Sequence, residues 1–139
     1  MSIANFIIDI IPVDWIDKYI TLKSKDPIKF DKFVLNSNPD ILESIGQKKA
    51  IYIFKKAANN IKFYNKFLRK NKVNFQDIKN IEDFNQKVPP IDKVGYIRNS
   101  KKLHDLCLPE HSDEPELLVR SSGFTGNPQT WIESKKEIE

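Results

Sequence analysis

Apolar side chains recur at helical spacing in the middle of the chain. Between residues 48 and 71, five of them follow the ~3.6-residue period that places them on one face of an α-helix. They are Ala50, Phe54, Ala57, Ala58 and Ile61. The segment is therefore predicted to be helical. Lysines 48, 49, 55 and 56 flank this face, and we expect them to be solvated.

Polar residues before apolar runs predict where further helices begin. A side chain at the N-cap accepts a hydrogen bond from a backbone N–H of the first turn. Candidate caps are Asp26, Asn38, Asn80, Asp92 and Ser100. Proline follows the first two, at a helix position that tolerates its missing N–H. The helices after Asn80, Asp92 and Ser100 are expected to be short.

The last quarter of the chain predicts a small β-hairpin. "ELLVRSS" (116–122) is a short apolar run that ends in small polar residues, and "PQTWIE" (128–133) is its candidate return strand. "LPEHSDEPE" (108–116) is expected to be an exposed loop, and the capping box "SKKE" (134–137) predicts a further helix start. The fold class is therefore mainly α with a small β-hairpin near the C-terminus.

The N-terminal stretch "IANFIIDIIPVDWI" (3–16) is apolar but does not predict a membrane span. Asp9 and Pro12 interrupt it, whereas a span needs ~20 mostly apolar residues. It also lacks the positive leader and cleavage site of a signal peptide. We expect a buried or interface helix here, with an amphipathic surface anchor as the alternative.

Composition suits one globular domain in a reducing compartment. The chain has 139 residues, of which 40% are hydrophobic and 30% charged. Its net charge of +4 is modest, acidic residues are spread among the lysines, and no basic stripe with interleaved aromatic residues stands out, so no nucleic-acid partner is expected. The single cysteine, Cys107, favours a cytoplasmic location. His104 and His111 beside it match no zinc spacing, so ordinary packing or surface roles are expected.

Two of the four glycines lie in "SSGFTG", residues 121–126. Glycine lets backbone N–H groups approach a phosphate closely, and serine and threonine hydroxyls add hydrogen-bond donors. The loop is therefore chemically able to hold a phosphate chain. An ordinary hairpin connection is the alternative. The P-loop of nucleotide hydrolases is excluded, because it requires Gly-Lys-Ser/Thr and here Asn127-Pro128 follows the second glycine.

Three blocks resemble the adenylate-forming superfamily, and most closely its phenylacetate–CoA ligase and acyl-protein synthetase branch. "LLVRSSGFTGNPQ" resembles the family's phosphate loop, S/T-S/T-G-T/S-T-G-x-P-K. Upstream, "AANNIKFYNKFLRKN" and "NIEDFNQKVPPIDKVGYI" are similar to family segments that occur in the same order. The resemblance covers roughly residues 48–133, and the phosphate loop is its most specific part.

This resemblance implies an enzyme that joins a carboxylate to the α-phosphate of ATP and then passes the acyl group to a thiol, such as coenzyme A. ATP and Mg²⁺ are the implied cofactors. Five residues would surround the β- and γ-phosphates: Ser121, Ser122, Gly123, Thr125 and Gly126. No catalytic residue and no metal ligand is expected within this chain.

The resemblance also implies how the chain is organised. Residues 1–47 form a helical segment without a recognised motif, and residues 48–139 form a partial ligase domain that stops after the loop. Such a portion is expected to be inactive alone, and its partner would be a complementary downstream polypeptide or a second copy. The alternative is a free-standing helical protein-binding module derived from the same fold.

Two positions depart from the family pattern. Phe124 stands where the family has Thr or Ser, and Gln129 stands where it has Lys. A hydroxyl and a positive charge are therefore missing from the expected phosphate site. Hydrogen bonds to charged groups are worth ~1.5–3 kcal/mol each, so the affinity for ATP should be reduced.

Overall fold

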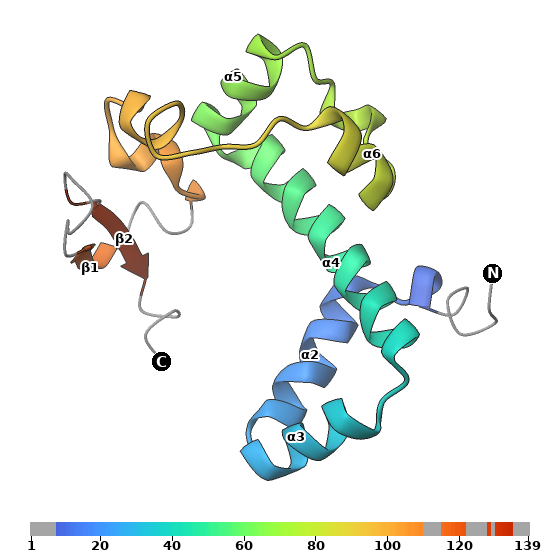
Figure 1. Cartoon of the computed structure of the whole chain (residues 1–139). Coiled ribbons are helices and arrows are strands. Elements are labelled where there is room, and N and C mark those ends of the chain that lie inside the picture. The colour runs from blue at the N-terminus through green and yellow to red at the C-terminus, as the bar shows by residue number, and fades with distance from the viewer. Residues whose placement is uncertain (1–7, 110–114, 122–127, 129, 135–139) are drawn as a thin grey trace. The chain divides into compact units, whose positions relative to one another are not determined.

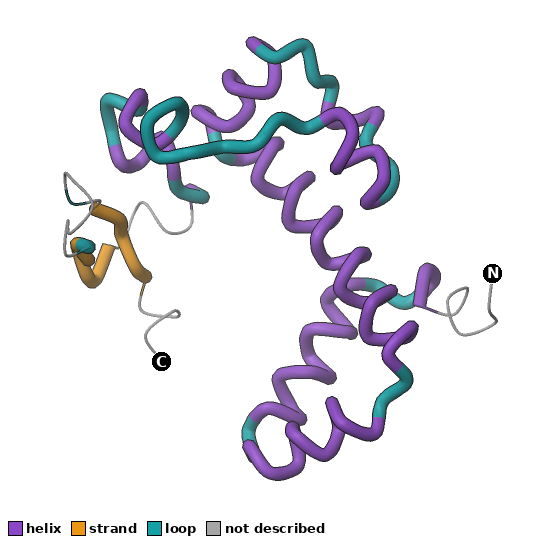
Figure 2. Tube along the Cα trace, in the orientation of Figure 1, coloured by secondary structure: helices purple, strands orange, loops and turns teal. Residues whose placement is uncertain are grey.

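The computed structural model describes residues 8–109, 115–121, 128 and 130–134. These residues form a mainly helical fold with a two-stranded antiparallel hairpin, as predicted (Figures 1 and 2). The α-helices are α2 (Val13–Ser24), α3 (Pro27–Asn36), α4 (Pro39–Asn60), α5 (Lys62–Lys70) and α6 (Ile81–Lys87). Three 3₁₀ turns are η1 (Phe75–Asp77), η2 (Ile97–Asn99) and η3 (Leu103–Leu106). The strands are β1 (Pro115–Arg120) and β2 (Thr130–Ser134).

The chain divides into two compact units. The first comprises Met1–Phe54 and Asp77–Gln86, and the second comprises Lys55–Gln76 and Lys87–Glu139. The first division falls within α4, between Phe54 and Lys55. No helix among the described residues is long and apolar enough to span a membrane.

The predicted caps of three helices are confirmed. The Asp26 carboxylate accepts hydrogen bonds from two backbone N–H groups in the first turn of α3. A side-chain hydrogen bond from Lys29, followed by these backbone bonds, holds the pKa of Asp26 below its ordinary value. Asn38 accepts a bond from the first turn of α4. Asn80 accepts the N–H of Asp83, whose carboxylate accepts the N–H of Lys79, so α6 begins with a reciprocal capping pair.

The helices expected after Asp92 and Ser100 are tighter and shorter than α-helices. Asp92 does accept the N–H of Gly95, but the chain then forms a turn and η2 rather than an α-helix. The expectation for Ser100 is wrong: its hydroxyl donates to the carbonyl of Lys102 instead of capping an N–H group. Without that cap, residues 103–106 form the single 3₁₀ turn η3.

The helical segment predicted at 48–71 is two helices, and the first starts earlier. Pro39–Asn60 is one continuous helix, and α5 begins at Lys62. Between them Ile61 is extended, with φ −89° and ψ 104°. The amide of Asn65 donates to the carbonyl of Ala58 at 2.8 Å, which satisfies an acceptor left free by the break. The apolar period runs through this break, which is why the sequence pattern did not reveal it.

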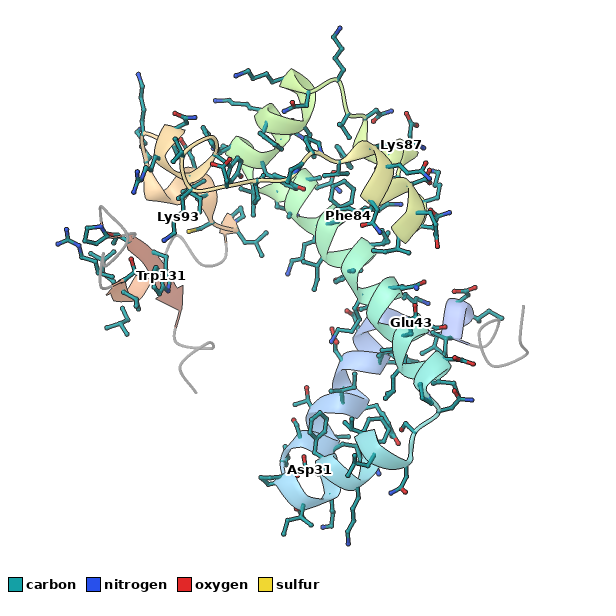
Figure 3. The ribbon with its side chains drawn as sticks, in the orientation of Figure 1. Asp31, Glu43, Phe84, Lys87, Lys93 and Trp131 are labelled. Atoms are coloured by element: carbon teal, nitrogen blue, oxygen red, sulfur yellow. The ribbon has the colours of Figure 1, made fainter. Side chains whose placement is uncertain are left out.

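The first unit has a small apolar core. Its buried side chains include Ile8, Ile16, Phe54 and Ile78. The ring of Phe54 on α4 meets that of Phe84 on α6 edge to face, with centroids 5.1 Å apart (Figure 3). This contact attaches α6 to the middle of α4. The unit therefore joins segments distant in the sequence through a few aromatic and aliphatic contacts.

The second unit is organised around Tyr96. Its ring lies 5.1 Å from Phe63, 5.2 Å from Phe67 and 6.1 Å from Tyr64, measured between centroids. Burial, together with the neighbouring Tyr64, raises the pKa of Tyr96 to about 12. The fully buried Ala58 and Leu68 belong to the same unit. The predicted helix face is thus partly confirmed, since Phe54 and Ala58 are buried, but Ala50 is exposed.

Two of the lysines expected to be solvated are engaged with the N-terminal segment. The Lys48 ammonium donates to the backbone carbonyls of Ile8, Asp9 and Ile11 at 2.7, 2.7 and 2.6 Å. Lys49 forms an ion pair with Asp17 on α2. The expectation was wrong because residues 8–10 form a helical turn that stops before Pro12 and leaves carbonyls without helical partners.

The expected N-terminal helix is only partly present. Of the apolar stretch 3–16, residues 3–7 lie outside the described part, residues 8–10 are helical, and α2 begins at Val13. Pro12 occupies the N-cap position of α2 without a capping side chain. Ile8 and Ile16 are buried as expected, whereas Trp15 is 71% exposed.

Candidate phosphate-binding loop

The hairpin that carries the candidate loop is antiparallel and regular at the end next to the loop. There Arg120 pairs with Thr130, and Val119 pairs with Trp131, which Figure 3 labels on β2. The register is irregular only near the start of β1, between Pro115 and Leu117. The predicted pair of strands is therefore confirmed. Its connection comprises residues 121–129, which are the residues that resemble the phosphate loop.

The structure describes two residues of this connection. Ser121 follows β1 directly and is half-buried, and Pro128 precedes β2 by two positions and is also half-buried. Four other predicted phosphate contacts lie outside the described residues: Ser122, Gly123, Thr125 and Gly126. Phe124 and Gln129, the two departures from the family pattern, also lie outside them. The structure thus brings the two ends of the loop together and leaves the roles of its middle residues as predictions.

The sequence between the two described strands is longer than a tight hairpin turn requires. β-Hairpins are usually closed by about two to five residues, most often in primed turns rich in Asn-Gly or Gly. The described ladder reaches Arg120 and Thr130, and residues 121–129 lie between these two residues in the sequence. Two glycines and several hydroxyls are thus placed, by sequence, between two paired strands, and an anion cradle would require their backbone N–H groups to converge.

Arg120 is a candidate anion contact that the sequence interpretation overlooked. It is the last residue of β1, it is exposed, and it directly precedes Ser121. A guanidinium there could donate charge-assisted hydrogen bonds to a phosphate. The available signal was its position immediately before "SSG", together with the loss of the family's lysine at Gln129.

No metal centre is found in the part of the chain that the structure describes. No three His, Cys, Asp or Glu side chains are grouped there so that they could hold an ion. Cys107 is half-buried and forms no disulfide, His104 lies in η3, and His111 lies outside the described residues.

The first unit also contains a pocket of ≈ 280 Å³. Asp9, Ser44, Gln47, Lys48, Ile51, Lys79, Asn80 and Ile81 line it. The polar groups of this pocket already have structural roles, because Lys48 donates to three carbonyls and Asn80 caps α6. We therefore assign no ligand to it.

Comparison with protein-family models, with curated proteins and with solved structures found no match to this chain. The candidate function therefore depends on the chain's own motifs and on the geometry of the hairpin.

Proposed function

We propose that this chain is an N-terminal portion of an ATP-dependent acyl-adenylating ligase and that residues 121–129 hold the phosphates of ATP. The supporting observation is that β1 and β2 are paired strands and that the sequence between them contains "SSGFTG". In the proposed reaction a carboxylate oxygen attacks the α-phosphorus of ATP. The bond to the bridging oxygen breaks, pyrophosphate leaves, and the acyl-adenylate then reacts with a thiol to give a thioester and AMP.

The residues of the loop would act by electrostatic stabilisation. Backbone N–H groups at Gly123 and Gly126 would face the β- and γ-phosphates, and the hydroxyls of Ser121, Ser122 and Thr125 would donate to their oxygens. Arg120 would supply a positive charge at the base of the loop. These contacts would orient the triphosphate and stabilise the charge that develops on the leaving pyrophosphate.

The same proposal predicts weak binding and no turnover by residues 1–139 alone. In the enzymes that the chain resembles, the residues for adenine and metal binding follow the loop. Phe124 and Gln129 further remove a hydroxyl and a charge from the site. We expect no exchange between ATP and labelled pyrophosphate with a panel of aryl and fatty acids. Exchange above a heat-inactivated control would contradict this expectation.

The loop can be tested directly by isothermal titration with pyrophosphate. Phe124→Thr combined with Gln129→Lys should increase the affinity, most clearly at low ionic strength, where charge screening is weakest. Adding Gly123→Val should abolish the gain, because a β-branched side chain blocks the approach of the backbone. Arg120→Gln should weaken binding, whereas Lys18→Gln, on exposed α2, should leave it unchanged. If the double variant binds no better than the natural chain, the phosphate role must be withdrawn.

A protein-binding module is the second candidate, and exposed apolar side chains favour it. Trp15 on α2 is 71% exposed, Ile28 on α3 is 68% exposed and Leu35 on α3 is 82% exposed. Apolar surface of this kind is typical of protein–protein contacts. If the loop variants do not alter anion affinity while these helices mediate association, the binding-module function is favoured.

A further inference from the structure

Positive charge is concentrated in one part of the second unit. Residues 55–76 and 87–109, all of them described, contain twelve Lys or Arg residues and only two acidic residues, Asp92 and Asp105. The basic residues are Lys55, Lys56, Lys62, Lys66, Arg69, Lys70, Lys72, Lys87, Lys93, Arg98, Lys101 and Lys102. The modest net charge of the whole chain, +4, conceals this separation.

Helix α5 presents the densest group of these charges. Lys62, Lys66 and Lys70 follow each other at four-residue spacing and are exposed. None of the three forms an ion pair with any other described residue. On the adjoining face of the helix, Phe63 and Phe67 pack on the ring of Tyr96. Like charges at this spacing destabilise a helix, so folding alone does not explain the arrangement.

A further cation occupies a strained backbone position at the end of α5. Lys72 has φ 60°, a left-handed conformation that favours glycine. Its N–H donates to Arg69 O at 3.0 Å, and the N–H of Val73 donates to Leu68 O at 2.9 Å. These two bonds form a Schellman motif, in which glycine is the usual residue at the position of Lys72. A lysine there adds charge beside Arg69 and Lys70 at a conformational cost.

A groove of ≈ 410 Å³ joins these charges to aromatic side chains. It is lined by Phe63, Lys66, Phe67, Lys70, Gly95, Tyr96 and Asn99. Two lysines therefore border a groove with aromatic walls, and the backbone of Gly95 lines it without a side chain. The Asn99 amide donates to Gly95 O at 2.8 Å and leaves its own side-chain oxygen as an acceptor. This combination suits a ligand that carries both a phosphate and a planar base.

We infer that this basic surface binds single-stranded nucleic acid. We define the α5 surface as Lys62, Lys66, Arg69, Lys70, Lys72 and the groove beside them. The lysines and Arg69 contact consecutive phosphates, and the groove receives an unpaired base against its aromatic walls. An acidic protein would use the cations but would have no group that requires the aromatic groove. The sequence-based expectation of no nucleic-acid partner relied on the apparent lack of a basic stripe with interleaved aromatic residues, whereas α5 and the groove beside it combine both.

The test measures the fluorescence anisotropy of labelled oligonucleotides of about twelve nucleotides with the full chain, at ~50 to 200 mM salt. Lys66→Gln with Lys70→Gln should weaken binding about tenfold at low salt and reduce the salt slope by about 1.4. Lys18→Gln with Lys32→Gln removes the same charge from exposed positions of α2 and α3 and should change the affinity less than about twofold. Circular dichroism should show the same helix content and no lower melting temperature for the Lys66/Lys70 variant, because removing like charges does not weaken α5.

Each alternative has a distinct outcome. An equal loss of oligonucleotide affinity in both pairs of variants would show that only the net charge of the protein matters. It would overturn the assignment of the binding site to the α5 surface. Competition by polyglutamate as effective as that by the oligonucleotide would overturn the inference in favour of an acidic protein. Displacement by free AMP at comparable concentration would identify a mononucleotide as the ligand instead of a strand. Absence of binding at the lowest salt would also refute the inference, and none of these outcomes depends on residues 121–129.

Discussion

Lys48 stabilises the N-terminal segment by holding three backbone carbonyls at once. Its ammonium lies 2.6 to 2.7 Å from the oxygens of Ile8, Asp9 and Ile11. A single side chain thus replaces the helical partners that these carbonyls lack beyond the turn at residues 8–10. Because Ile8 is one of the few buried side chains of the first unit, this contact also keeps part of the core in place.

Lys48→Met should therefore lower the free energy of unfolding by about 2 kcal/mol, since it keeps the aliphatic length and removes the charged donors. Urea denaturation followed by circular dichroism would measure the change. Lys18→Met, at an exposed position of α2, is the matched control and should stay within ~0.5 kcal/mol of the natural chain. Similar losses in the two variants would argue against a structural role for the Lys48 ammonium.

Lys72→Gly should stabilise the protein by about 1 kcal/mol, because glycine adopts the left-handed backbone at φ 60° without steric cost. Lys70→Gly lies two residues earlier, in the last turn of α5, and should instead destabilise by about 0.5–1 kcal/mol. Thermal melts of the two variants should shift in opposite directions. A fall in melting temperature for both would show that the lysine side chain at 72 makes a stabilising contact that outweighs the strain.

Because the pKa of Tyr96 is raised in the folded chain, we expect the protein to lose stability at alkaline pH. This pKa is raised to about 12 in the folded chain, against 10.0 without the fold, because burial disfavours the charged phenolate. The stabilisation is complete below pH ~10 and decreases as the pH rises towards about 12, by about 1 kcal/mol after allowance for solvent screening. Urea midpoints between these pH values should fall more steeply for the natural chain than for Tyr96→Phe. If the urea midpoints of the two proteins fell in parallel with pH, the raised pKa of Tyr96 would not be the cause of the loss of stability.

At the scale of secondary-structure elements, local signals predicted helix starts well. Asp26, Asn38 and Asn80 bond to N–H groups two or three residues away, so adjacent letters suffice to identify them. The start of α2 has no such signal, because Pro12 offers no capping side chain. The break at Ile61 was missed for another reason: apolar spacing continues through it, and the side-chain bond from Asn65 to Ala58 depends on how the chain folds back.

Two alanines of α4, one buried and one exposed, allow burial to be tested by matched substitutions. Ala58 is 0% exposed, whereas Ala50, which the apolar period placed on the same face, is exposed. Ala58→Leu should cost about 1–3 kcal/mol through overpacking, and Ala50→Leu should change the free energy of unfolding by less than ~0.5 kcal/mol. Chemical denaturation of both variants measures the difference. Equal effects would contradict the observed difference in burial.

The candidate site was predictable only in part. "SSG" followed by a second glycine identified the loop from sequence, and the two apolar runs around it predicted the strands that the structure contains. The candidate contact Arg120 was overlooked although it directly precedes "SSG", because the family motif used for the comparison begins at Ser121. The contacts of Lys48 span 37 to 40 positions along the chain, so no local pattern could distinguish it from a solvated lysine.

At the scale of the whole molecule, exposed apolar side chains predict self-association. Trp15, Tyr19 and Leu22 follow helical spacing on α2 and are 71%, 49% and 58% exposed. Sedimentation velocity should show larger species as the concentration rises, because association removes this apolar surface from water. Trp15→Gln with Leu22→Gln should reduce the effect, whereas Lys18→Gln with Thr21→Gln on the same helix should not. A natural chain that stays monomeric at every concentration would contradict the prediction.

The division into two units limits where the polypeptide can be cleaved, or its gene recombined, without dividing a unit. Each unit is built from two separate stretches, so the polypeptide crosses between them after Phe54, after Gln76 and after Gln86. No single cut therefore releases both units intact. Neither unit could be gained, lost or exchanged as one contiguous gene segment, and recombination anywhere between Phe54 and Gln86 would divide at least one of them.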